Sequence, residues 1–150
     1  MTEFRPVVIL TPETASEARQ GMPQFFGISG ASANASGISM NLTAFPPGGR
    51  AKVHYHRDFE TAIYGITGRI ALHWGMTLEN ACLIAPGTFC FIPPEVPHVA
   101  FNLSLTEPAS AITARNDPAE QENVVTVPAL DQRVDALMSQ YPELARPKGK

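Results

Sequence analysis

Two of the four histidines in the chain lie one residue apart, in the stretch KVHYHRDFETAIYGITG from Lys52 to Gly68. In a β-strand, side chains at positions i and i+2 point to the same face, about 6.6 Å apart along the strand, so His54 and His56 can present two imidazoles to one ion. Glu60 follows four residues later and adds a carboxylate. An HxH pair alone is weak evidence, because two half-exposed histidines on a strand have the same spacing.

A second group of candidate residues lies in the stretch GTFCFIPPEVPHVAFN, about forty residues further along the chain. Together the two stretches resemble the two signature motifs of the cupin superfamily. The first motif is a glycine, five residues, HxH, three or four residues, a glutamate and six residues to a closing glycine. Its counterparts here are Gly48, His54, His56 and Glu60, with Gly68 closing the motif after seven residues rather than six. The second motif is matched by Gly87, Pro93, His98 and Asn102, with Glu95 where the family has a glycine.

The resemblance covers roughly Leu42 to Ala114 and implies a metal site. The residues at the ligand positions are His54, His56, Glu60 and His98. Three neutral imidazoles and one carboxylate suit one divalent first-row ion per chain, and Fe(II), Mn(II), Ni(II) and Zn(II) all stay open. Closed structural zinc sites depend on thiolates, but Cys82 and Cys90 do not have ligand spacing. We expect both to be buried thiols in strands, with a catalytic or ligating role for Cys90 as the lesser alternative.

Further candidates surround this expected site. Glu60 and Tyr64 are the catalytic candidates, and the carboxylate of Glu60 can neutralise part of the ion's charge and accept a proton. Counting by twos from Glu60 places Tyr64 on the same inner face, where it either orients substrate or fills the barrel. Arg50 and Lys52 share the parity of the two histidines, and Asn102 that of His98. The substrate-binding candidates are therefore Tyr64, Arg50, Lys52 and Asn102, although a solvated strand end explains Arg50 and Lys52 equally well.

Two residues outside the motifs are expected to have no part in the chemistry. Arg115, in the stretch ARNDPAEQENVV, is expected to pair with a carboxylate in a structural role rather than contact substrate. His73, next to the single tryptophan, is expected at the surface.

The resemblance implies a small metal-dependent enzyme acting on a small organic substrate. Dioxygenase chemistry requires redox-active iron, whereas isomerase, cyclase or lyase chemistry can use other divalent ions, and the sequence favours neither. The alternative is a non-catalytic cupin that binds a metal or a small metabolite. The cupin fold hosts both kinds of protein, so the fold does not decide between them.

The elements that must position these residues are short strands separated by prolines and glycines. We expect strands at 38–44, 51–56, 61–66, 69–74, 81–84, 88–92, 98–102, 109–114 and 124–127. They predict an all-β fold, a single cupin jelly-roll barrel with its core at about 38–127. Apolar residues at helical spacing predict a C-terminal helix at about 130–141, and Thr11 and Pro12 suggest a short N-terminal helix.

Composition narrows the classes of partner. A length of 150 residues with even composition favours one domain spanning 1–150. The formal net charge is −3 and no lysine or arginine run is present, so we expect no nucleic-acid partner. We find neither a signal-peptide pattern nor a twenty-residue apolar span, and therefore expect a cytoplasmic protein without membrane contact. Open sheet edges and the apolar run Val7 to Leu10 suggest a homodimer.

Overall fold

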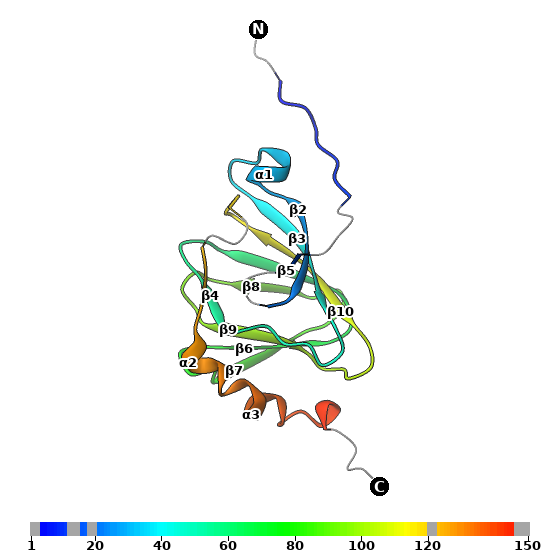
Figure 1. Cartoon of the computed structure of the whole chain (residues 1–150), viewed down its shortest axis with the longest axis vertical. Helices are drawn as coiled ribbons and strands as arrows, with labels where there is room; N and C mark the ends of the chain where they lie inside the picture. Colours follow the sequence, from blue (N-terminus) through cyan, green and yellow to red (C-terminus); the bar gives the residue numbers. More distant parts are fainter. Residues whose placement is uncertain (1–3, 12–15, 18–20, 120–122, 146–150) are drawn as a thin grey trace.

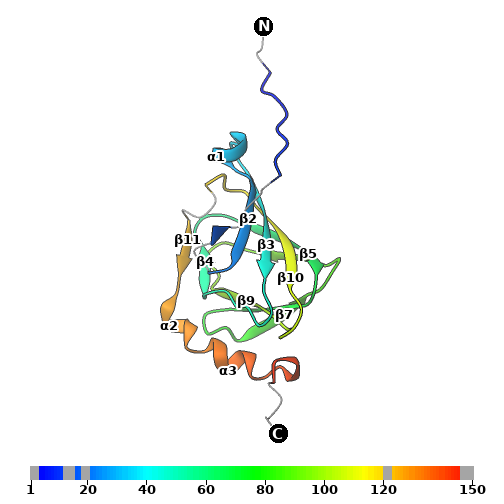
Figure 2. The ribbon, with the colours of Figure 1, turned by 45° about the vertical axis from the view of Figure 1, so that its right-hand side comes forward.

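The computed structural model of the protein describes residues 4–11, 16–17, 21–119 and 123–145. Its strands form two antiparallel sheets, which enclose the core (Figures 1 and 2). The first sheet has the order β1-β2-β3-β10-β5-β8, with β1 at Ser16–Glu17, β2 at Pro23–Ile28, β3 at Ser39–Phe45, β10 at Ala109–Arg115, β5 at Thr61–Thr67 and β8 at Phe89–Ile92. The second has the order β11-β4-β9-β6-β7, with β11 at Val124–Thr126, β4 at His54–His56, β9 at His98–Asn102, β6 at Ile70–Trp74 and β7 at Asn80–Ile84.

Strict alternation along the strands decides which side chains enter the barrel. On β10, Ala109, Ala111, Thr113 and Arg115 are buried, whereas the residues between them are partly exposed. Because side chains of a strand point alternately to its two faces, these four residues share the inner face. The apolar core includes Phe45, Ala111 and Leu72 on the inner faces of the sheets, and Val99 and Phe101 on the face of β9 opposite to His98.

The all-β jelly-roll expectation is confirmed, and each expected strand is present with its ends within three residues of the expected ones. The sequence did not predict β2, whose segment PQFFGI begins with proline and contains Gly27. The pairing of β2 with β3 shifts register between Phe26 and Ile28. A Cβ atom at Gly27 would lie 2.8 Å from the carbonyl oxygen of Met40, so the glycine permits this close approach.

The expected C-terminal helix is present in pieces. Helix α2 spans Pro128–Asp131, α3 spans Val134–Met138, and a 3-10 turn follows at Pro142–Leu144. The N–H of Arg133 donates to the carbonyl of Leu130, a tighter bond than an α-helix uses, and this interrupts the helix. Val134 is fully buried against the barrel, and the Asp131 carboxylate accepts a hydrogen bond of 2.9 Å from the N–H of Val53. Figures 1 and 2 show these helices along the edge of the second sheet.

The front of the chain differs from the expectation. The expected N-terminal helix falls largely on residues 12–15 and 18–20, outside the described residues, while 16–17 form β1. A single helical turn, α1 at Gly30–Ala33, follows β2 instead and is capped by Ser29 and Ser32. Among the described residues, no helix is long and apolar enough to cross a membrane.

Candidate metal centre

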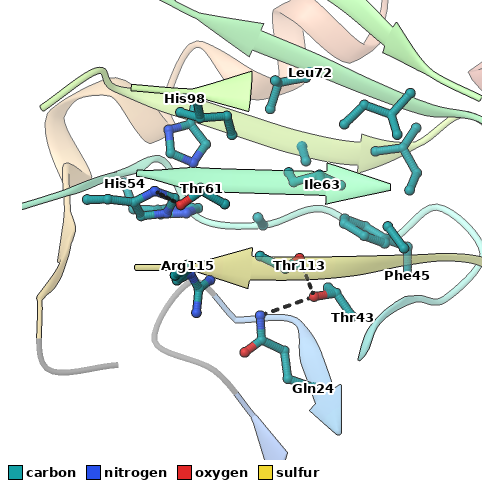
Figure 3. Close-up of a pocket in the computed structure, with 17 residues that line it drawn as sticks. Gln24, Thr43, Phe45, His54, Thr61, Ile63, Leu72, His98, Thr113 and Arg115 are labelled. Atoms are coloured by element: carbon teal, nitrogen blue, oxygen red, sulfur yellow. Dashed lines mark hydrogen bonds between the residues drawn. The ribbon is translucent and has the colours of Figure 1, made fainter. Parts of the chain in front are cut away.

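The three motif histidines meet inside the barrel. His54 and His56 lie on β4 with both side chains buried, and His98 begins β9 directly opposite His54. Their ring centroids are 4.3 Å (His54 to His98), 4.6 Å (His56 to His98) and 5.2 Å (His54 to His56) apart. One nitrogen of each ring lies within 4.8 Å of the other two. Figure 3 shows His98 facing His54 and Thr61 across the cavity.

Hydrogen bonds on the far side of the rings fix how two of the imidazoles point. Nδ1 of His54 lies 2.8 Å from the carbonyl oxygen of Lys52, and Nδ1 of His98 lies 2.9 Å from that of Val96. A carbonyl oxygen only accepts, so Nδ1 carries the proton and Nε2 keeps its lone pair for a ligand. The two strand backbones thus prepare both rings to bind a metal through Nε2.

His56 is held by a side chain rather than by the backbone. Its Nδ1 lies 2.7 Å from the hydroxyl of Thr61, and its ring stacks on Phe59 at 4.7 Å. Nε2 of His56 is buried and has no hydrogen-bond partner among the described residues. A buried polar atom without a partner is costly, and a metal ion would satisfy it.

Burial keeps all three rings neutral. Desolvation lowers the pKa of His54 well below its usual value, and the charge of His98 adds to this effect. Desolvation also lowers the pKa of His98, to about 4. The pKa of His56 is lowered strongly by the same burial and by the charges of His98 and His54. Neutral imidazole is the form that binds metals, so the cluster is ready for a cation at neutral pH.

Glu60 does not join the cluster, contrary to the sequence expectation. Its side chain is exposed and lines an outer surface hollow, and the candidate metal-binding group found among the described residues contains only the three histidines. Thr61 takes the inner position instead, with only 1% of its surface exposed. A shift of one residue along a strand moves a side chain to the opposite face, which explains the exchange.

The sequence contained a signal for this exchange. Four residues separate His56 from Thr61, and six separate Thr61 from Gly68. Both spacings fit the family motif, whereas Glu60 leaves seven residues before the closing glycine. The irregular spacing therefore marks a threonine at the family's glutamate position, not an altered turn. Glu95, at the family's glycine position in the second motif, has a φ of 64°, the left-handed conformation that favours glycine.

Two further candidates face away from the histidines. Tyr64 is 40% exposed on the outer face of β5, where its ring lies 4.8 Å from that of Phe89. Arg50 pairs with Asp135 at 3.0 Å, at the surface. Neither residue lines the cavity at the histidines.

Neither Lys52 nor Asn102 presents its side chain to the histidines as a substrate-binding group. Lys52 is exposed, and only its carbonyl oxygen reaches the site, through His54. Asn102 is fully buried and its Nδ2 donates to three carbonyls, those of Phe45, Pro46 and Glu107. These bonds tie together the loops at the far end of β9.

Arg115, expected to have a structural role, lies inside the barrel. It is 4% exposed, pairs across the sheet with Thr61, and its guanidinium carbon lies 5.8 Å from the centroid of the Phe59 ring. Its charge contributes to the lowered pKa of each of the three histidines. Burial lowers the pKa of Arg115 itself to about 10, so it is still charged at neutral pH.

The cavity at the histidines has a volume of about 50 Å³. Its polar lining consists of the three histidines, Arg115, Gln24, Thr43, Thr61 and Thr113. The remaining lining is apolar and includes Phe45, Ile63 and Leu72 (Figure 3). No carboxylate lines the cavity among the described residues, so its one formal charge is the positive charge of Arg115.

Other expectations about reactive side chains are corrected. His73 is buried, not at the surface, and its Nε2 lies 2.8 Å from the Tyr141 hydroxyl. Cys82 is exposed and Cys90 half-buried, and neither lines the cavity. Partial desolvation by neighbouring residues raises the pKa of both thiols, which disfavours the reactive thiolate.

The histidine cluster fits a divalent metal ion. Bonds of about 2.0–2.1 Å place three nitrogens of a tetrahedral site about 3.3 Å apart, and modest closure of the observed cluster reaches that spacing. Three neutral nitrogens leave one or more positions of the ion open, as in catalytic sites. Nitrogen ligands suit Zn, Fe and Ni alike, so the donor set does not select one.

The fold and site define a class: a jelly-roll barrel with three convergent histidines inside it. A sequence profile described as "Cupin domain" matches residues 41–114, and a search of curated proteins found no match. Residues 41–114 of this small protein therefore form a cupin domain.

Solved structures support the same fold. Peruvianin-I, a cysteine peptidase from Thevetia peruviana latex, is 18% identical, with a TM-score of 0.63, and the match covers 79% of this chain and 78% of that one. Oxalate decarboxylase from Lactobacillus farciminis is 16% identical, with a TM-score of 0.65, covering 86% of this chain and 41% of that one. An oxalate oxidase is 17% identical, with a TM-score of 0.65, and the match covers 89% of this chain and 80% of that one. At these identities the likeness concerns the fold alone.

Proposed function

We propose that the protein is a metal-dependent enzyme that acts on a small organic substrate beside one divalent ion held by His54, His56 and His98. The observation that carries this proposal is the buried cluster of three neutral imidazoles, two of which point a free Nε2 inward because their Nδ1 is bonded to a carbonyl. Protein interiors rarely hold three polar rings in contact without a ligand to satisfy them.

The residues of the chain have separate tasks in this proposal. The two strands β4 and β9 hold the ligands rigidly, and Thr61 orients His56. The apolar lining excludes water from the substrate side of the cavity. An ion bound there would supply Lewis-acid polarisation for isomerase, cyclase or lyase chemistry, or, as redox-active iron, dioxygenase chemistry. A cytoplasmic location and a homodimeric assembly are part of the same proposal.

A second candidate function is a non-catalytic cupin that binds a metal or a small metabolite. One observation favours it: no carboxylate lines the described cavity, so the site has no general base of the kind expected at Glu60. The two functions share the metal but differ in turnover. Oxygen uptake and substrate-depletion assays on the metal-loaded protein separate them.

Elemental analysis of the purified protein tests the metal site directly. We expect about one divalent ion per chain in the wild type and almost none in His98→Ala, because loss of one of three ligands leaves too few. Circular dichroism checks that the variant is folded. Glu60→Ala is the matched control, since its exposed side chain lies outside the cluster, and it should keep its metal. Full metal content in His98→Ala would refute the ligand assignment. Oxygen uptake by the protein reloaded with iron then tests whether the enzyme is a dioxygenase.

A further inference from the structure

Two thiols lie at the open edge of the barrel. The chain has two cysteines, both of them free, and neither lines the cavity at the histidines. Cys82 lies on β7, the last strand of the second sheet, and Cys90 lies on β8, the last strand of the first sheet. A covalent bond between the two thiols would therefore join one sheet to the other.

The strand registers place both thiols on the inner faces of their sheets. Cys82 pairs with Leu72 of β6, and Cys90 pairs with Ile63 of β5. Both partners line the cavity, as drawn in Figure 3. Residues directly opposite each other in an antiparallel pair share one face of the sheet. The two cysteines therefore face each other across the edge of the barrel rather than pointing to opposite sides.

The corner between β7 and β8 holds these strands close together. Residues 85–88 connect them, so Cys82 lies three residues before this connection and Cys90 two residues after it. The N–H of Thr88 donates to the carbonyl of Ala85 at 3.1 Å, which closes the turn. Desolvation raises the pKa of each thiol, and a side-chain hydrogen bond between the two thiols also acts on both pKa values. The sulfur atoms are thus in contact.

We propose that Cys82 and Cys90 form an oxidation site, at which a reversible disulfide clamps the first sheet to the second. A disulfide requires facing Cβ atoms about 3.8 Å apart, and two inner-face residues in contact across a barrel edge suit this requirement. Each cysteine also lies on an end strand, which has one unpaired side and can adjust to the bond. This inference goes beyond the proposed function and does not depend on a metal.

The oxidant is a low-molecular-weight disulfide of the glutathione class. The thiolate of the exposed Cys82 attacks one sulfur of the oxidant, the oxidant's S–S bond breaks, and the first thiol leaves. The thiolate of Cys90 then attacks the Cys82 sulfur, and the second thiol leaves. The oxidant gains two electrons, and the protons of the two cysteines end on the two released thiols. In the cytoplasmic location proposed above, such a bond would form under oxidising conditions and be reversed by free thiols.

The clamp would act on one wall of the cavity. Ile84 of β7 and Ile92 of β8 line the cavity, and each lies two residues from a cysteine. Together with the cross-strand partners of the two cysteines, they form an apolar wall that draws on both sheets. A bond across the edge would hold the two halves of this wall in one arrangement.

The test treats the reduced full-length protein, with a chelator present, with a mixture of oxidised and reduced glutathione and then traps free thiols with iodoacetamide. Because the chain has only two cysteines, a disulfide within the chain has one possible connectivity. We expect a product that is lighter by two hydrogens, takes up no iodoacetamide, runs as a single chain on a denaturing gel and is reversed by dithiothreitol. Desolvation raises the pKa of Cys90 to about 11, so the rate should increase from about pH 7 to about pH 9.

Two matched variants separate the steps of the reaction. Cys90→Ser should stop at the mixed disulfide and carry one glutathione, because the second thiol is missing. Cys82→Ser leaves only the half-buried thiol, and we expect it to react on the order of tenfold more slowly. Circular dichroism checks that both variants are folded. Equal rates in the two variants would overturn the assignment of Cys82 as the attacking thiol.

Urea unfolding tests the clamp itself. The oxidised protein should unfold at a higher urea concentration than the reduced protein, with a folding equilibrium constant on the order of ten- to hundredfold larger, because the bond restricts the unfolded chain. Cys82→Ser given the same treatment should show no shift. An oxidised protein that is no more stable than the reduced one would overturn the clamp. A disulfide that forms only between chains, or only after unfolding, would overturn the oxidation site and leave the metal proposal untouched.

Discussion

Thr61 contributes to the site through His56 rather than through the metal. Its hydroxyl is 2.7 Å from Nδ1 of His56 and fixes the ring from behind. We expect Thr61→Val, which keeps the shape and removes the hydroxyl, to weaken metal binding on the order of tenfold, because partners behind ligating histidines have effects of that size. Competition with a coloured chelator measures the affinity.

The matched control for this prediction is Glu60→Gln at the neighbouring position. Its side chain is exposed and outside the cluster, so its metal affinity should stay at the wild-type value. Equal metal affinities of Thr61→Val and wild type would show that His56 binds metal without the hydrogen bond to Thr61. A loss in Glu60→Gln as large as that in Thr61→Val would return the ligand role to the glutamate.

The buried histidines also make the stability of the metal-free protein depend on pH. His98 has a pKa of about 4 in the folded state, against 6.5 when unfolded, and the pKa values of His54 and His56 shift in the same direction. Below pH 6.5 the histidines of the unfolded chain bind protons that those of the folded chain do not. The free energy of unfolding therefore falls as the pH drops from about 6.5 to about 4. The shift at His98 alone corresponds to about 3 kcal/mol.

Urea unfolding of the protein with chelator, at several pH values between about 7.5 and about 4, measures this dependence. His98→Gln removes one of the three titrating groups and should flatten the curve. A free energy of unfolding that is constant across this range, or that rises toward acid pH, would contradict the burial of neutral rings.

At the scale of elements, β5 illustrates why the sequence predicted the strand but not its inner face. Residues 61–66 were expected as a strand and β5 is Thr61–Thr67, so its position was confirmed. Counting from Glu60 gave the wrong parity, because the chain enters the strand one residue later. Thr61, Ile63 and Gly65 therefore face inward, while Tyr64 faces out.

Other site features depended on contacts between distant parts of the chain. The histidine positions followed from local spacing and a family motif, and the convergence of His54, His56 and His98 in the barrel matches that expectation. Arg115 and His73 gave no local signal, because their burial depends on the partners Thr61 and Tyr141, 54 and 68 residues away in the sequence. Strand pairing of this kind cannot be read from periodicity within one segment.

The turn between β5 and β6 depends on one glycine. Gly68 has a φ of 72°, and a Cβ atom there would lie 2.6 Å from Cβ of Ala109. We expect Gly68→Ala to lower the free energy of unfolding by about 2 kcal/mol or more, through backbone strain and this contact. Urea unfolding checks the value.

Gly37→Ala provides the comparison for this turn. A Cβ atom at Gly37 would meet nothing within 4 Å, and its backbone is not left-handed. Its effect should stay within about 0.5 kcal/mol, as for most surface changes. If both variants lost similar amounts of unfolding free energy, the left-handed backbone and close contact at Gly68 would not explain the effect of Gly68→Ala.

For the whole molecule, the outer face of β5 and β8 is the surface that favours a homodimer. Phe89 is 85% exposed, Phe91 62%, and Tyr64 and Ile66 each 40%. β8 is also the edge strand of its sheet. An apolar face at an open edge is typical of an interface. We expect light scattering to give twice the 16.2 kDa chain mass, and the double variant Phe89→Ser, Phe91→Ser to give a monomer.

Met76→Ser is the control for the dimer prediction. Met76 is 75% exposed between β6 and β7, outside this face, and its loss should leave the mass unchanged. A monomer for wild type at micromolar concentration would refute the homodimer. A dimer that survives the double variant would assign the interface to another surface, such as residues 4–11, which extend away from the barrel in Figure 1.

The pairing of β6 with β9 places Trp74 opposite His98. It is the one tryptophan of the chain and is 41% exposed, so its indole emission comes from a single place next to a proposed ligand. Ions with partly filled d shells quench such emission at short range, whereas closed-shell zinc does not. We therefore expect the loading of the barrel with such an ion, and its exchange for zinc, to change the Trp74 emission, which can be followed in real time without any label.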